Sequence, residues 1–189
     1  MPVDVNIDPK DLKFLEHVLK NVKDGVPRVL APAINRALES GRTVVKREIR
    51  QHYVIKAKDI PVKIQRATRS NPQGAMVLAD KMLDLGKFNV SPSRLLKRKR
   101  TIRAQVKVGG GGPLPGAFHT PLTYPGPYVR KGRSRLPIVK LLAISAPIMA
   151  SQPSVGPAVE KAMGDTLEKR IDHELERVLH GAGGKITSP

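Results

Sequence analysis

The sequence predicts an α+β fold: N-terminal helices, then a small antiparallel sheet with long basic hairpins or loops, then a long C-terminal helix. Apolar residues recur at helical spacing in the first part of the chain. Extended segments separated by Gly and Pro follow, and a late segment carries an apolar residue at every fourth position. The 189 residues suffice for one domain with a buried core. We expect that domain over 1–181, with a flexible tail at 182–189.

Two helices and a shorter third are predicted before residue 70. Asp8-Pro9 is a typical helix start, and Asp24-Gly25 should end that helix. A longer helix is expected from about Pro27 to Tyr53, because apolar residues form one stripe along it. Asp59 is expected to cap the third helix. The apolar positions are Leu12, Leu15, Leu19 and Val22; then Leu30, Ile34, Ala37, Val44, Val45 and Ile49; then Val62, Ile64 and Ala67.

After residue 70 the pattern becomes extended. The segments 75–80 and 101–108 alternate between apolar and polar residues, as half-buried strands do. Four glycines at 109–112 predict a turn or loop, within an extended basic loop region at about 91–116. Two more short strands are expected at 117–120 and 128–131. Because prolines are dense around them, we expect both at a sheet edge. The core should be aliphatic, since the chain has only three Phe and three Tyr.

The last helix is predicted to start after Pro153-Ser154 and to end near Leu179, before Gly181. One of its faces carries the apolar residues Val155, Val159, Met163, Leu167, Ile171, Leu175 and Leu179. Glu174 and Arg177 are placed for an intrahelical ion pair.

Positive charge is very unevenly distributed. The formal net charge is +18, and residues 85–159 contain thirteen Lys or Arg and no Asp or Glu. Such an imbalance indicates binding to nucleic acid, to an anionic membrane or to an acidic protein surface. A basic solvent-exposed face without a partner is the alternative, although such faces usually mix both signs.

Composition and terminal sequence limit the cellular compartments in which this protein is expected to work. The chain has no Cys, which excludes disulfides and thiolate chemistry. The N-terminal residues lack the pattern of a signal peptide. The most apolar segment, 136–150, is too short to span a bilayer and contains Lys140. We therefore expect a soluble protein made and used in the cytoplasm, without a membrane partner.

No motif for catalysis, a metal or a cofactor is complete. His173-Glu174 resembles the start of a zinc-protease helix, but Arg177 stands where the second His is required. His119 is expected to be satisfied by backbone groups. The glycine runs lack the Lys and Ser/Thr of a phosphate-binding loop. We expect no enzyme activity, no catalytic residue, no metal site and no cofactor.

The candidate site is therefore a basic surface that contacts a partner or DNA. Phosphate contact needs only positive charge and is independent of base sequence. Base stacking would need aromatic residues, and only Tyr124 and Tyr128 lie near the clusters. The candidate residues are Arg94, Lys97, Arg98, Lys99, Arg100, Arg103, Lys107, Arg130, Lys131, Arg133 and Arg135.

The order of several short motifs resembles the minor tail protein Z, or tail completion, family of long-tailed bacteriophages. The resemblance covers roughly 27–180. The Lys97–Arg100 run and the glycines at 109–112 are more pronounced than in that family's pattern. The motifs are Ala33–Leu38, the basic helix to Tyr53, Ile60–Ala67, Leu85–Phe88, Ala104–Val108, Gly116–Phe118, Tyr128–Gly132, Arg135–Ile138 and Ala146-Pro147.

This resemblance implies a structural component of the virion. Members of the family act at the head-proximal end of the tail and complete it, so that it can join the filled head. It also implies a homo-oligomeric ring, expected to be a hexamer. The implied partners are other tail and neck proteins: the tail terminator, the tail tube and the connector rings. The protein would be in the host cytoplasm during assembly and then in the virion tail.

A different class of function stays open from the charge alone. The chain could be a nucleic-acid-binding protein without sequence specificity, and phage DNA is also an alternative partner within the virion. Binding of that kind weakens steeply as salt is added, because each phosphate contact releases counterions.

Overall fold

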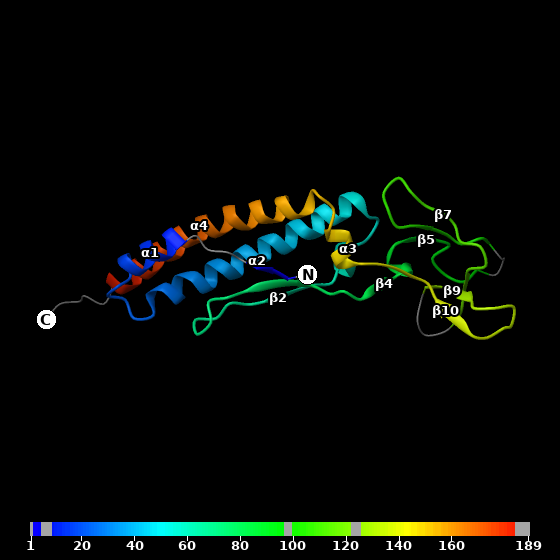
Figure 1. The fold of residues 1–189 in the computed structure, drawn as a ribbon, viewed down its shortest axis with the longest axis horizontal. Coiled ribbons are helices and arrows are strands. Elements are labelled where there is room, and N and C mark those ends of the chain that lie inside the picture. Colours follow the sequence, from blue (N-terminus) through cyan, green and yellow to red (C-terminus); the bar gives the residue numbers. More distant parts are fainter. Residues whose placement is uncertain (1, 5–8, 97–99, 122–125, 184–189) are drawn as a thin grey trace. The chain divides into compact units, whose positions relative to one another are not determined.

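A computed structural model describes residues 2–4, 9–96, 100–121 and 126–183 (Figure 1). The chain forms two compact units. The first, here called the helical unit, comprises Met1–Val45, Val62–Leu78 and Gly156–Pro189. The second, here called the strand unit, comprises Lys46–Pro61 and Ala79–Val155. The predicted α+β class is confirmed.

Two long helices build the core of the helical unit. Helix α2 (Gly25–His52) packs on helix α4 (Val155–Gly183), and α1 (Pro9–Val18) precedes them (Figure 1). The part of α2 from Lys46 onward and the first residue of α4 belong to the strand unit. The apolar stripe predicted for α2 is buried along its whole length. Gly41 lies against Met163, and the Thr166 hydroxyl donates to Ser40 Oγ at 3.0 Å. The absence of a side chain at Gly41 allows this close approach.

The apolar face predicted for α4 is confirmed as far as Ile171 and then shifts. Beyond that residue Glu174 and Val178 are buried, whereas Leu179 is 40% exposed. A four-residue repeat rotates by about 40° per step on a helix of 3.6 residues per turn, so the stripe moves off the buried face. The predicted pair is present: Arg177 lies 2.6 Å from the Glu174 carboxylate. The helix continues to Gly183, so the predicted stop at Gly181 was wrong.

A three-stranded antiparallel sheet completes the helical unit. Its order is β1 (Pro2–Asp4), β3 (Ala75–Leu78), β2 (Val62–Gln65). The third helix predicted here was wrong: Val62 and Ile64 also fit the two-residue period of a strand, and they pair with Leu78 and Met76. Asp59 ends a short 3-10 helix, η1 (Ala57–Asp59), and caps no following helix.

Asn35 connects α2 to the end of β2. Its amide Nδ2 donates to the Ala67 carbonyl at 2.9 Å, and its Oδ1 accepts from the Ala67 backbone N–H at 2.9 Å. Both polar groups of the partly buried Ala67 peptide are therefore satisfied by one side chain.

The described residues of the strand unit form three small sheets, where the sequence suggested one. The first has the order β5 (Asn89–Ser91), β6 (Arg103–Gln105), β7 (Gly112–Pro113). The second has the order β10 (Ile138–Lys140), β9 (Pro127–Arg130), β8 (Phe118–His119). The third pairs β11 (Leu142–Ser145) with β4 (Met82–Asp84). Three short helices, η1, η2 (Leu85–Lys87) and α3 (Ala146–Ala150), also lie in the described part of this unit.

Several expectations for this region need correction. The strand predicted at 101–108 is limited to β6, and 91–116 contains β6, β7 and the turn between them. Strand β8 lies at an edge as predicted, but β9 is central in its sheet. Pro127 is compatible with that place because it is the first residue of the strand, where a missing N–H interrupts no ladder.

The strand unit has an aromatic component in its core, contrary to the expectation of an aliphatic one. Tyr53, Phe88 and Tyr128 are buried. The backbone of Tyr53, just after α2, forms an antiparallel β-bridge with Lys107. The Tyr53 hydroxyl accepts a hydrogen bond from Gln152 Nε2 at 2.9 Å. The backbone of Ile55 forms a second antiparallel β-bridge, with Phe88. The segment after α2 thus anchors the small sheets. Among the helices of the described ranges, none is both long and apolar enough to cross a membrane.

We predict that Asn35→Ala lowers the free energy of unfolding by about 2 kcal/mol, because the Ala67 N–H and carbonyl lose their partners in a partly buried place. Urea unfolding followed by circular dichroism measures this change. Thr43→Ala is the matched control, since the Thr43 hydroxyl donates to Glu39 within the same helix at an exposed position. The control should change stability by less than about 0.5 kcal/mol. Equal losses in the two variants would contradict the role of Asn35.

Candidate partner-binding surface

Nearly all of the net charge belongs to the strand unit. This unit contains 19 Lys or Arg and four Asp or Glu, a net charge of +15. The helical unit contains 15 Lys or Arg and 12 Asp or Glu, a net charge of +3. The imbalance seen along the sequence is therefore a property of one folded unit, and it extends to residues 46–61 and 79–84.

Three of the four carboxylates in the strand unit have internal partners. Glu48 is buried and accepts from Arg47 Nε at 3.1 Å. Asp80 accepts from the Ser145 hydroxyl at 3.1 Å. Asp84 pairs with Lys140 and accepts from the Gly86 N–H at 2.9 Å. The fourth, Asp59, is half-buried at the end of η1. The carboxylates thus do little to balance the positive surface.

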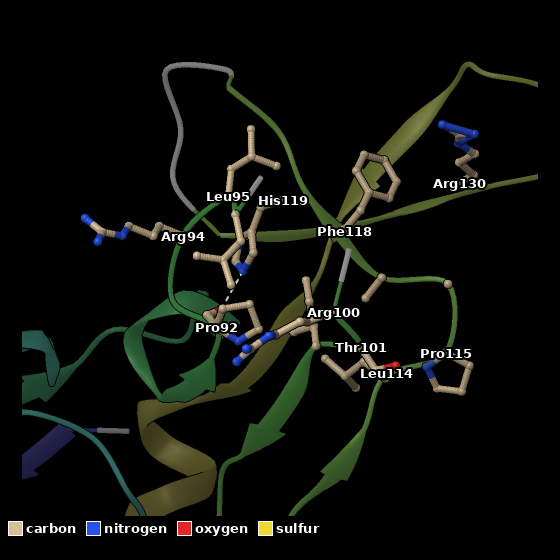
Figure 2. Close-up of a pocket in the computed structure, with 14 residues that line it drawn as sticks. Pro92, Arg94, Leu95, Arg100, Thr101, Leu114, Pro115, Phe118, His119 and Arg130 are labelled. Atoms are coloured by element: carbon tan, nitrogen blue, oxygen red, sulfur yellow. Dashed lines mark hydrogen bonds between the residues drawn. The ribbon is translucent and has the colours of Figure 1, made fainter. Parts of the chain in front are cut away.

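Three of the predicted arginines line one pocket of about 930 Å³. Arg94 and Arg130 lie toward opposite ends of it, with Arg100 between them (Figure 2). The described residues of the lining include no Asp or Glu. The remaining lining residues are mostly apolar: Pro92, Leu95, Leu96, Thr101, Ile102, Leu114, Pro115, Gly116, Ala117, Phe118 and His119.

His119 holds one wall of this pocket. Its Nε2 lies 2.7 Å from the Pro92 carbonyl oxygen, and its Nδ1 lies 3.2 Å from the Gly126 carbonyl oxygen (Figure 2 shows the first bond). The prediction that backbone groups satisfy this histidine is confirmed. The imidazole N–H donates to one of these backbone carbonyl oxygens, and both oxygens lie against the ring, so His119 holds β8 to neighbouring backbone.

Phe118 is the aromatic residue of the site that the sequence argument missed. The Arg130 guanidinium lies over its ring, 5.3 Å from the centroid, as a cation–π pair. The two residues are twelve positions apart and meet because Phe118 pairs with Tyr128 across β8 and β9. Tyr128 itself is buried, so it is not available for stacking. Tyr124 lies outside the described residues.

The other predicted residues do not converge on the pocket. Arg103 is exposed on β6, and Lys107 lines a small pocket with His52 and Gln152. Lys131, Arg133 and Arg135 are exposed in the connection between β9 and β10. Lys97, Arg98 and Lys99 lie outside the described residues.

A second basic pocket, of about 700 Å³, was not predicted. It brings together the end of α2, η1 and η2, which are separated in sequence, so no local pattern could reveal it. Its charged lining consists of Arg50, Lys56, Lys58, Lys87 and Asp59. No group of three potential metal ligands from His, Asp and Glu occurs within the described parts of the chain.

We predict that removing charge from the strand unit raises its thermal stability at low salt. Arg133→Gln with Arg135→Gln should raise the melting temperature by about 2–4 °C, because mutual repulsion of cations decreases. The gain should vanish near 1 M NaCl, where the Debye length is about 3 Å. Calorimetry at both salt concentrations measures it.

The matched control is Lys161→Gln with Lys169→Gln in the helical unit, where acids and bases are nearly balanced. This pair should give no gain at low salt. An equal gain from both pairs would show that net charge alone matters, irrespective of the unit that carries it.

No protein-family model matches the chain, and comparison with curated proteins and with solved structures finds no significant similarity.

Proposed function

We propose that this protein is a structural component of a long-tailed bacteriophage virion: a minor tail, or tail completion, protein at the head-proximal end of the tail. In this role it helps to join the tail to the head, and its strand unit binds an anionic neighbour. The observation that carries the binding role is the concentration of a net charge of +15 in one unit whose acids are mostly used internally. The virion setting is carried by the motif resemblance.

Residues of the motifs that carry the resemblance contact one another in the fold, which supports the view that the motifs reflect a fold shared with that family. Asn35 of the first motif bonds Ala67 of the third. Phe118 pairs with Tyr128, and Arg130 pairs with Ile138, so three further motifs are joined through the sheet of β8, β9 and β10. The motif residues thus hold the fold together, as expected for a structural protein without an active site.

In the proposed assembly the protein forms a homo-oligomeric ring of six copies. Its neighbours would be the tail terminator, the tail tube and the connector rings. A ring component has to hold its neighbours by shape and charge, and the uncompensated cations of the strand unit suit a neighbour with an acidic surface.

Non-sequence-specific binding of nucleic acid is the second candidate function. The exposed arginines between β9 and β10 favour it, because phosphates are contacted by positive charge without any pocket. In this case affinity for a DNA duplex would fall steeply with salt concentration.

We predict that the purified protein forms a discrete oligomer and binds isolated phage tails. Light scattering gives the mass of the oligomer, and negative-stain electron microscopy shows whether a ring sits at one end of the tail. A DNA duplex should compete weakly at physiological salt. A protein that stays monomeric, never attaches to tails and yet binds the duplex with a steep salt dependence would contradict the tail assignment and establish the second function.

A further inference from the structure

The arginine-lined pocket of the strand unit also exposes apolar side chains. Leu95 is 56% exposed and Leu96 is 37% exposed, and both line the pocket beside Arg94. Leucines are normally removed from water during folding, because burial of an apolar side chain is favourable. A pocket that keeps two leucines accessible among arginines therefore suits a ligand that is both anionic and apolar.

Another part of the pocket lining is fixed by local hydrogen bonds. The Leu114 N–H donates to the Ile102 carbonyl at 2.7 Å, and the Ala117 N–H donates to the Leu114 carbonyl at 3.2 Å. Gly116, at φ +72°, completes this turn in a conformation that favours glycine. His119 ties the following strand to Pro92. A wall held in this way needs little reordering when a ligand binds, which favours affinity.

The chemistry of the pocket favours a protein segment over nucleic acid. Phosphates would satisfy the arginines but have no apolar group for the leucines. Bases would need an open aromatic ring, whereas Arg130 covers one face of Phe118 and Tyr128 is buried. A peptide with carboxylates on either side of an apolar residue satisfies both features. The positions of Arg94 and Arg130 toward opposite ends suit an extended peptide (Figure 2).

We infer that this pocket binds an extended acidic segment of a neighbouring protein, which places an apolar side chain against Leu95, Leu96 and Phe118. Its carboxylates would pair with Arg94, Arg100 and Arg130. The inference rests on the proposed function and specifies the chemistry of the partner: an acidic protein segment with an apolar anchor.

Fluorescence anisotropy with two labelled peptides tests this inference on the full-length protein. One peptide alternates Glu with Leu; the other is polyglutamate of the same charge. At physiological salt the first should bind about tenfold more tightly, as expected for the burial of a leucine side chain. Equal affinities for the two peptides would overturn the inference.

Variants locate the binding. Leu95→Ser with Leu96→Ser should reduce affinity for the Glu–Leu peptide to that for polyglutamate, because both leucines are exposed in the pocket. Arg94→Gln with Arg100→Gln should lower the affinity for both peptides. The charge-matched control, Arg133→Gln with Arg135→Gln, should preserve the tenfold difference. Circular dichroism verifies that each variant is folded. Loss of that difference in the control, or its survival without the leucines, would overturn the assignment to this pocket.

Competition with a DNA duplex separates the two classes of partner. The duplex should not abolish the preference for the Glu–Leu peptide, and the leucine variant should bind DNA as the wild type does. Weaker DNA binding by the leucine variant would instead assign the pocket to nucleic acid. Binding to phage tails is measured separately. A preference for the Glu–Leu peptide without tail binding contradicts only the proposed virion role. Tail binding without that preference contradicts only the inference about the pocket.

Discussion

Repulsion between like charges is the constraint on which the rest of the strand unit depends. Nineteen cations and four acids belong to a unit built from small sheets. Three of the acids are bound to Arg47, Ser145 and Lys140 or to backbone, so they fix the fold locally and leave most cations without compensation. An anionic partner would relieve this repulsion, and stability and binding are therefore two consequences of one charge distribution.

The fold resists this repulsion with contacts other than ion pairs. In the segment after α2, Tyr53 and Ile55 form antiparallel backbone β-bridges with Lys107 and Phe88, and the Tyr53 and Phe88 side chains are buried. The His119 ring lies between the Pro92 and Gly126 carbonyl oxygens of separate segments and donates to one of them. Such short strands have few ladder hydrogen bonds of their own, so buried aromatics and side-chain bonds supply connections that the sheets lack. The same contacts shape the arginine-lined pocket.

Much of the helical framework was predictable because helical periodicity is a local property. The stripe of α2 and the face of α4 as far as Ile171 follow from the spacing of apolar residues. The local sequence does not decide whether the segment of Val62 and Ile64 is a helix or a strand, because these residues fit both the helical and the strand periodicity. Pairing with β3 selects the strand. The central place of β9 and the division into small sheets depend on strand partners, which no local pattern specifies.

The sequence by itself determined that a basic, acid-free region exists, because charge and residue type do not depend on folding. Only the tertiary structure decided which cations meet. It joins Arg94, Arg100 and Arg130 in one pocket with exposed leucines and leaves Arg133 and Arg135 outside it. The cause is strand pairing: Phe118 opposite Tyr128 brings Arg130 onto the pocket wall across twelve residues of chain. The positive charge specifies a negatively charged partner, and the pairing of β8 with β9 determines the shape of the pocket that the partner has to fit.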